Sequence, residues 1–294
     1  MREGVLSRSG LSSDAEVLDR VNRVLGPVDV VRDESVRPQH GRVLRVMTRS
    51  GEVSFVKWFT EQADYQRELD ALTHYTPALG HDAPRLISND DGLRVLLISE
   101  VAGDQVAGSG LEWDPLVHFK AGALIRKLHE SATPVVTDQF ARQCAARFED
   151  AASRVEGSVS SSLVSEARLL IAQAMDLSSL ALVPAHRDNH PRNWMVDPGE
   201  HVRLIDFGLA EYDPWVVDVF LLEQDYWRTD PSLKVAFLSG YDREMTEGDS
   251  VALRAHHAVS AMVALANASQ PGSTRAEKLK SRDMFDSLLG MTLF

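Results

Sequence analysis

The sequence is poor in cysteine and lacks long apolar runs. Cys144 is the single cysteine among 294 residues, so no disulfide can form within the chain, and we expect a reducing compartment. No stretch reaches the ~18 apolar residues that a membrane span requires, and the first residues lack the apolar segment of a signal peptide. These absences predict a cytoplasmic protein without a membrane partner.

Positive charge is also scarce. Lysine and arginine total 31 against 43 aspartates and glutamates, which gives a net charge of −12. A chain with this balance does not attract nucleic acid through broad electrostatics, so we expect no nucleic-acid partner, whereas cationic ligands remain open. The hydrophobic content of 44% is ordinary for a globular protein, and the length suits one large or two closely joined domains.

The first hundred residues have the pattern of a sheet with one helix. Apolar runs at residues 43–47 and 53–59 flank a turn at Gly51 and predict a hairpin. A helical pattern follows over residues 61–75, and residues 93–101 have the continuous apolar character of a buried strand.

The pattern of apolar residues changes after Gly103, where helical spacing begins. Helical patterns cover residues 116–129 and 141–182, with a serine-rich break, and most of the chain from residue 215 onward. Two short strands are expected at 194–196 and 202–205. We therefore predict a β-rich N-terminal domain over residues 1–103 and a mainly helical domain over residues 104–294.

Two motifs in the second half carry the chemistry. Residues 186–193 (HRDNHPRN) contain the carboxylate of Asp188 and, five positions later, the amide of Asn193. Residues 206–208 (DFG) follow at the end of the next expected hairpin strand, so the two motifs can converge on one point. Metal-assisted phosphoryl transfer needs such a set, with ligands for Mg²⁺ and a group that orients the attacking hydroxyl. Each motif alone is common in turns, and the assignment depends on both at this spacing.

The pair of motifs resembles the protein-kinase signature, H-R-D-x-x-x-x-N followed by D-F-G. Carried over residue by residue, the resemblance implies that Asp188 accepts or orients the substrate proton. Asn193 and Asp206 would hold Mg²⁺, and His186 and Arg187 would shape the loop.

Lys57 lies inside the apolar segment 53–58, where a charged side chain requires an explanation. Alternation on an edge strand is one explanation. The other is the kinase lysine that binds the α- and β-phosphates of the nucleotide and pairs with a glutamate of the next helix. We favour the second interpretation, with Glu68 as the partner.

Other nucleotide contacts are assigned by position. No G-x-G-x-x-G loop precedes the lysine, and Gly41 is the candidate for a phosphate contact, with a plain turn as the equal alternative. Glu100 and Val101 end the buried strand where a connector between lobes is expected, so their backbone groups are candidates for binding the adenine.

With these motifs the chain resembles the aminoglycoside phosphotransferase and choline kinase-like superfamily over residues 41–294. His190 matches the family pattern H-x-D-x-H-x-x-N, and only nine residues separate Gly208 from Asp218, without an A-P-E motif. The segment 213–219 resembles the family's aspartate-containing segment, where Asp218 would support the catalytic loop through its amides. The resemblance implies an α+β, two-lobed protein-kinase-like fold, with a small β-rich N-lobe and a larger helical C-lobe that holds most of the substrate.

The acidic charge of the segment after the two motifs bears on the substrate. Residues 211–249 hold ten acidic and three basic residues, which favours a cationic acceptor, although solvated helix faces explain the same count. We take Glu223 and Asp225 as candidate acceptor contacts. Phe294 is another, because the end of the chain is similar to the aromatic C-terminus of aminoglycoside 3'-phosphotransferases.

Together these features predict a Mg²⁺-dependent O-phosphotransferase that moves the γ-phosphate of ATP or GTP to a hydroxyl of a small molecule, an antibiotic in the favoured case. We expect a monomer or a weak dimer. A metabolic kinase acting on choline, a sugar or homoserine is the main alternative, and a non-catalytic nucleotide-binding scaffold is another. Protein kinase activity is disfavoured because the activation segment is missing.

Overall fold

The chain forms two compact units, and each unit is made of two segments that are separate in the sequence. The computed structural model describes residues 13–35, 41–155, 159–177, 179–270 and 272–290. Unit 1 comprises Met1–Gln105 and Asn193–Ala210, and unit 2 comprises Val106–Arg192 and Glu211–Phe294. The expected boundary at residue 103 lies two residues before the first division, but the segment 193–210 groups with the N-terminal residues rather than with the helical domain.

Unit 1 is built on a five-stranded antiparallel sheet of order β1-β2-β3-β5-β4. The expected hairpin is present as β2 and β3, and Lys57 pairs with Val43 across it. Strand β1 and helix α1 were not predicted, although α1 has apolar residues at helical spacing that follow a Ser13–Glu16 capping box. The elements that precede the connector are α1 (Asp14–Leu25), β1 (Val28–Asp33), β2 (Gly41–Thr48), β3 (Val53–Phe59), α2 (Gln62–His74), η1 (Thr76–Asp82), β4 (Leu86–Asp90) and β5 (Val95–Ser99).

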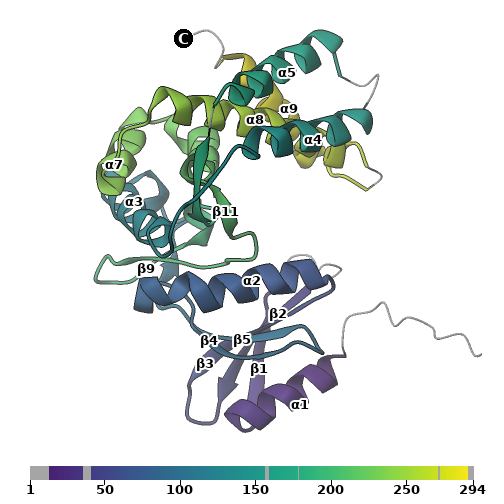
Figure 1. Ribbon diagram of the computed structural model, residues 1–294. Coiled ribbons are helices and arrows are strands. Elements are labelled where there is room, and N and C mark those ends of the chain that lie inside the picture. The colour runs from purple at the N-terminus through teal and green to yellow at the C-terminus, as the bar shows by residue number, and fades with distance from the viewer. Residues whose placement is uncertain (1–12, 36–40, 156–158, 178, 271, 291–294) are drawn as a thin grey trace, which may run out of the picture. The chain divides into compact units, whose positions relative to one another are not determined.

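Two helices cover the two faces of this sheet (Figure 1). Side chains alternate along a strand, so Val95 and Leu97 of β5 join one core cluster while Leu96 and Ile98 join another. The first cluster includes Val17 and Val21 of α1, and the second includes Tyr65 and Leu72 of α2. This two-sided burial explains why residues 95–98 are continuously apolar.

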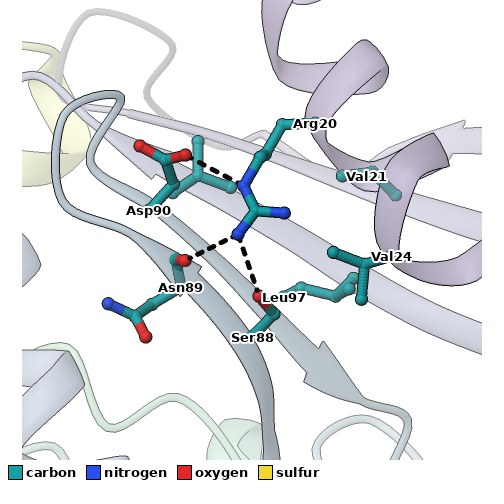
Figure 2. Close-up of a pocket in the computed structure, with 8 residues that line it drawn as sticks. Arg20, Val21, Val24, Ser88, Asn89, Asp90 and Leu97 are labelled. Atoms are coloured by element: carbon teal, nitrogen blue, oxygen red, sulfur yellow. Dashed lines mark hydrogen bonds and ion pairs between the residues drawn. The ribbon is translucent and has the colours of Figure 1, made fainter.

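Helix α1 is attached to β4 by one arginine. Figure 2 shows Arg20 reaching from the helix to the strand, where its Nε lies 2.9 Å from Oδ2 of Asp90. Its other end points at Ser88 Oγ and at the carbonyl of Asn89, at 3.5 and 3.4 Å. Val21 and Val24 lie beside this contact, so the ion pair closes the edge of an apolar helix interface.

The segment after β5 is held by a second small sheet. Strand β6 (Asp104–Gln105) pairs with β9 (Trp194–Val196), which pairs with β10 (Val202–Leu204). Gly103, at φ 114°, lies so close to β9 that a Cβ there would stand 2.7 Å from the carbonyl of Val196. Arg203 of β10 donates to the carbonyl of Ala102 and to Asp197, at 3.3 and 2.8 Å. The connector is therefore fixed to the hairpin that leads into Asp206.

Unit 2 is mainly helical, with one three-stranded sheet of order β11-β8-β7. Helix α8 packs against α4, α5 and α9, and α3 packs against α7. The elements are η2 (Leu111–Trp113), α3 (Pro115–His129), β7 (Val135–Thr137), α4 (Phe140–Ser153), α5 (Ser161–Met175), β8 (Leu180–Ala185), β11 (Glu211–Pro214), η4 (Trp215–Val219), α6 (Phe220–Leu222), the π-helix η5 (Glu223–Trp227), α7 (Pro231–Tyr241), α8 (Glu247–Ala268) and α9 (Arg275–Gly290). The 3₁₀-helix η3 (Pro191–Asn193) runs from unit 2 into unit 1.

None of the helices in the described ranges has the length and apolarity needed to cross a membrane.

Helices α3 and α7 cross at two glycines. A Cβ on Gly240 would lie 1.9 Å from the carbonyl oxygen of Phe119, and a Cβ on Gly122 would lie 2.1 Å from that of Phe237. Both obstacles are backbone atoms, which cannot rotate away. Only glycine permits this approach, which brings the C-terminal ends of α3 and α7 together.

We expect Gly240→Ala to destabilise the protein by about 1–3 kcal/mol or more, because the added methyl overpacks a backbone contact. The free energy of unfolding in urea measures the effect. Gly248→Ala in α8 is the control, since its Cβ would meet Leu177 at an ordinary 3.6 Å. Equal losses in both variants would show that the helix crossing does not require glycine.

Candidate functional site

Unit 1 contributes a buried lysine held between two carboxylates. Lys57 Nζ lies 2.7 Å from Oε1 of Glu68 and 2.9 Å from Oδ1 of Asp206. The Glu68 side chain is 2% exposed, whereas that of Asp206 is 54% exposed. Burial alone would lower the pKa of Lys57, but the two carboxylates outweigh it and raise the pKa above its usual value. Lys57 is therefore a fixed cation with one buried and one accessible partner.

Helix α2 and the end of the second hairpin position these partners. Glu68 lies on the buried face of α2, and burial raises its pKa. Arg67, its neighbour, donates to the carbonyl of Gly208 at 3.2 Å and ties the helix to the DFG segment. Asp206 has φ 66°, a left-handed conformation that is costly for a non-glycine residue and is often found at functional positions.

Asn193 and Asp206 lie beside each other in unit 1. The amide of Ile205 donates to the carbonyl of Asn193 at 3.0 Å, and Asp206 follows directly. In the described ranges, no group of three or more histidine, cysteine, aspartate or glutamate side chains could hold a metal alone. One carboxylate with a neighbouring amide still fits Mg²⁺, because this ion commonly takes one or two carboxylates and fills its shell with phosphate oxygens and water.

The candidate catalytic loop in unit 2 orients its carboxylate through a histidine. Nε2 of His190 lies 3.2 Å from Oδ1 of Asp188, and Nδ1 accepts from the amide of Arg192 at 3.2 Å. An accepting Nδ1 leaves the proton of a neutral ring on Nε2, so His190 donates to Asp188. The Asp188 side chain is 32% exposed, whereas that of His190 is 7% exposed.

Asp218 is buried and holds the start of this loop through hydrogen bonds. Its carboxylate accepts from the amides of His186, at 2.8 Å, and of Arg187, and its carbonyl accepts from the side chain of Asn189 at 2.8 Å. Burial would raise the pKa of Asp218, but the hydrogen bond from His129 and the amide of His186 outweigh it and lower the pKa. The carboxylate therefore remains charged inside the core.

Two residues behind Asp218 were not singled out from the sequence. His129, the last residue of α3, places Nε2 2.8 Å from Oδ2 of Asp218, and its Nδ1 lies 2.8 Å from the hydroxyl of Tyr241. Tyr241 ends α7 and stacks on Trp215 with ring centroids 4.7 Å apart. In the sequence, the only signal for His129 was its position at the end of an apolar helical pattern. Its partner Tyr241 lies more than a hundred residues away.

Arg187 adopts a left-handed conformation, φ 64°, and turns its guanidinium toward β11. There it pairs with Glu211 and, at 3.0 Å, with Asp213. Burial raises the pKa of Asp213 to about 6, against the opposing effect of Arg187. Arg187 thus pairs with two carboxylates of β11, and its role in shaping the loop stays a prediction.

The nucleotide contacts assigned by position have other visible roles. Gly41 begins β2, where a Cβ would stand 2.8 Å from the carbonyl of Trp58, and residues 36–40 before it lie outside the described ranges. The side chain of Glu100 pairs with Arg45 at 2.7 Å, and Val101 is buried. Adenine binding by the backbone of Glu100 and Val101 stays a prediction.

The candidate acceptor residues are already engaged within the chain. Glu223 pairs with Lys234 at 3.1 Å, and Asp225 pairs with Lys280 at 3.0 Å. Both carboxylates lie in the π-helix η5. Phe294 lies outside the described residues.

Comparison with known proteins identifies relatives. A model of the phosphotransferase enzyme family matches residues 37–253. No curated protein matches significantly.

Solved structures share the fold at low sequence identity. A choline/ethanolamine kinase family protein from Mesorhizobium loti has TM-score 0.71 and 13% identity, over 95% of this chain and 93% of that one. A thermostable mutant of aminoglycoside phosphotransferase APH(4)-Ia with ADP and hygromycin B has TM-score 0.70 and 13% identity, over 95% and 99%. Macrolide 2'-phosphotransferase MphH from Brachybacterium faecium has TM-score 0.63 and 13% identity, over 92% and 97%. The predicted kinase-like fold is confirmed.

We expect Lys57→Met to destabilise unit 1 by about 3 kcal/mol, because it leaves the buried Glu68 carboxylate without its cation. Chemical denaturation measures this loss. The double variant Lys57→Met/Glu68→Gln should recover much of it, since both charges are then removed. A double variant as unstable as the sum of the two single changes would contradict the coupling.

We expect Tyr241→Phe to loosen the catalytic loop, because His129 loses the hydroxyl that fixes its ring. One lost hydrogen bond of ~1 kcal/mol corresponds to about fivefold faster exchange of the protected amides of His186 and Arg187. Hydrogen exchange followed by NMR measures these amides. Tyr212→Phe is the control, because its hydroxyl donates to the carbonyl of Thr133 instead; identical exchange in both variants would contradict the role of Tyr241.

Proposed function

Because the chain belongs to the phosphotransferase enzyme family, we propose that it transfers the γ-phosphate of ATP or GTP to a hydroxyl of a small molecule, with Mg²⁺ as cofactor. The observation that carries the proposal is the position of Lys57 between Glu68 and Asp206. A buried cation with an accessible carboxylate beside it suits the phosphates and the metal of a nucleotide.

Unit 1 supplies the nucleotide half of the reaction in this proposal. Lys57 binds the α- and β-phosphates while Glu68 holds its ammonium in place, and the backbone of the connector at Glu100 and Val101 binds the base. Asp206 and Asn193 would hold Mg²⁺, which when bound neutralises charge on the phosphates.

Unit 2 supplies the acceptor half. Asp188 accepts a hydrogen bond from the attacking hydroxyl and takes its proton as the phosphorus–oxygen bond forms, while the nucleoside diphosphate leaves. His190 fixes one carboxylate oxygen of Asp188 and so orients the group toward its role as proton acceptor. Asp218 keeps the loop backbone in shape through the amides of His186 and Arg187.

An antibiotic acceptor is the favoured case. Structures of similar fold hold hygromycin B with ADP, streptomycin with ATP, and spectinomycin with ADP. A metabolic acceptor is the second candidate, because a choline/ethanolamine kinase family protein is among the most similar structures. We further propose a cytoplasmic protein that acts as a monomer or a weak dimer.

We expect Asp188→Asn to lower turnover by about 10²–10⁴-fold, because the amide cannot take the proton. A coupled nucleotide-consumption assay measures turnover with Mg²⁺ and ATP or GTP. The acceptors are hygromycin B, streptomycin, spectinomycin, a macrolide, choline, homoserine and a sugar.

Asp150→Asn, an exposed change in α4, is the matched control. Nucleotide binding should survive in both variants. Full turnover by Asp188→Asn would overturn the assignment of the catalytic carboxylate, and the accepted substrate would separate resistance from metabolism.

A further inference from the structure

Unit 2 contains a cavity of about 420 Å³ at the C-terminal ends of α3 and α7. Small-molecule sites measure roughly 300–1,000 Å³, so this cavity can hold a compact organic ligand. Its lining residues lie outside the loop 186–193, and none of them has been proposed to touch the nucleotide or the acceptor. The cavity is therefore separate from the candidate catalytic residues.

Two arginines that line the cavity have N–H groups that the chain does not use. Arg126 donates through Nε to Glu130 and through Nη1 to the carbonyl and the carboxylate of Asp242, at 2.8–2.9 Å. Arg243 donates through Nη2 to Asp249 at 3.0 and 3.1 Å. Among the described residues, no acceptor is bonded to Nη2 of Arg126 or to Nε and Nη1 of Arg243. Both guanidinium groups can therefore donate to a ligand.

Arg243 is held in place before any ligand binds. Its guanidinium lies over the ring of Trp215, 4.9 Å from the ring centroid, and its partner Asp249 is 8% exposed. Asp249 is fixed in turn by Nε1 of Trp215 at 2.7 Å and by the capping box that it forms with Thr246. A stacked and paired guanidinium has little freedom left to lose, and its planar edge matches a carboxylate or a phosphate.

The carboxylates that line the cavity are more exposed than its arginines. The side chains of Glu130 and Asp242 are 63% and 85% exposed, whereas those of Arg126 and Arg243 are 37% and 47% exposed. Water therefore screens the two carboxylates more strongly than the guanidinium groups. The balance favours an anionic ligand, and the nearby carboxylates favour a single negative charge over two.

We propose that this cavity is a second binding site, which takes a singly charged organic carboxylate with a compact apolar body. The carboxylate binds the guanidinium edges of Arg243 and Arg126. The apolar body packs against Ala132, Pro134 and Val183, which form the apolar part of the wall. The proposal concerns a different site from the proposed reaction and does not depend on it.

The cavity also reaches the hydrogen bonds that hold the candidate catalytic loop. Tyr241 lines it and bonds Nδ1 of His129 at 2.8 Å, and Nε2 of His129 lies 2.8 Å from Asp218. Because Asp218 is ionised, a neutral ring carries its proton on Nε2, and Nδ1 accepts from the tyrosine hydroxyl. Asp218 accepts from the amides of His186 and Arg187. A ligand that restrains Tyr241 therefore stabilises the start of the loop.

Calorimetry on the full-length protein tests the site with phenylacetate as the carboxylate probe. Phenylacetamide and benzylamine are the neutral and cationic probes of similar size. We expect Arg243→Lys to raise the Kd of phenylacetate about tenfold, a loss of ~1.4 kcal/mol, because the charge stays but the planar edge is lost. Ala132→Phe should raise the Kd at least as much, because the added ring fills the cavity while every charge remains.

Arg142→Lys, an exposed change on α4, is the matched control and should leave the Kd unchanged. Unfolding in urea shows that the variants are folded. Equal affinity of the wild type, Arg243→Lys and Ala132→Phe for phenylacetate would overturn the site. Phenylacetamide or benzylamine binding as tightly as phenylacetate, or no binding of phenylacetate at millimolar concentration, would overturn the carboxylate class.

Hydrogen exchange tests the connection to the loop. Saturating phenylacetate should slow exchange of the amides of His186 and Arg187 about fivefold in the wild type. Tyr241→Phe should still bind the probe, but the slowing should disappear because the hydroxyl is gone. Unchanged exchange in the wild type would refute the connection, and equal slowing in Tyr241→Phe would refute the route through the hydroxyl. Neither measurement uses a nucleotide, so failure of the proposed reaction leaves this test intact.

Discussion

A single buried carboxylate, that of Asp218, organises the candidate catalytic loop. Its two oxygens receive backbone amides from the start of the loop and the imidazole of His129, and its carbonyl receives the side chain of Asn189. An ionised carboxylate inside a core is tolerated only when such donors surround it. The left-handed backbone of Arg187 is held by the same contacts. The shape of this loop thus depends on a charge that is buried beneath it.

Local pattern was sufficient for much of the fold. Continuous apolar residues predicted the hairpin of β2 and β3 and the buried strand β5. These residues are apolar because both faces of the sheet are covered. Helix α1 was missed although its apolar residues recur at helical spacing, and β1 was missed because its residues, VDVVRD, lack strict alternation of apolar and polar side chains. The grouping of residues 193–210 with unit 1 was also missed, because it depends on the pairing of β9 with β6, which no local pattern encodes.

At the candidate site, sequence motifs identified residues that occur at a fixed spacing along the chain. Motifs did not identify residues that depend on contacts between distant parts of the chain. Lys57 and Glu68 were paired from their order along the chain, and the structure places their charged atoms together. No spacing rule identifies Tyr241, because its hydrogen bond joins two helices that are distant in sequence. Glu223 and Asp225 of η5 were predicted to contact a cationic acceptor, which stays a prediction, and each is paired with a lysine of the chain.

The return of the chain to unit 1 has a consequence for biosynthesis. Strand β6 leaves the ribosome long before β9, yet β9 is the strand it pairs with, and Arg203, which holds the connector at Ala102, arrives later still. The N-terminal unit therefore cannot finish folding as it emerges, although most of its sheet is already present. The segment that carries Asn193 and Asp206 becomes available only after α3, α4 and α5 have been made, so the order of translation delays the completion of unit 1 until much of unit 2 exists.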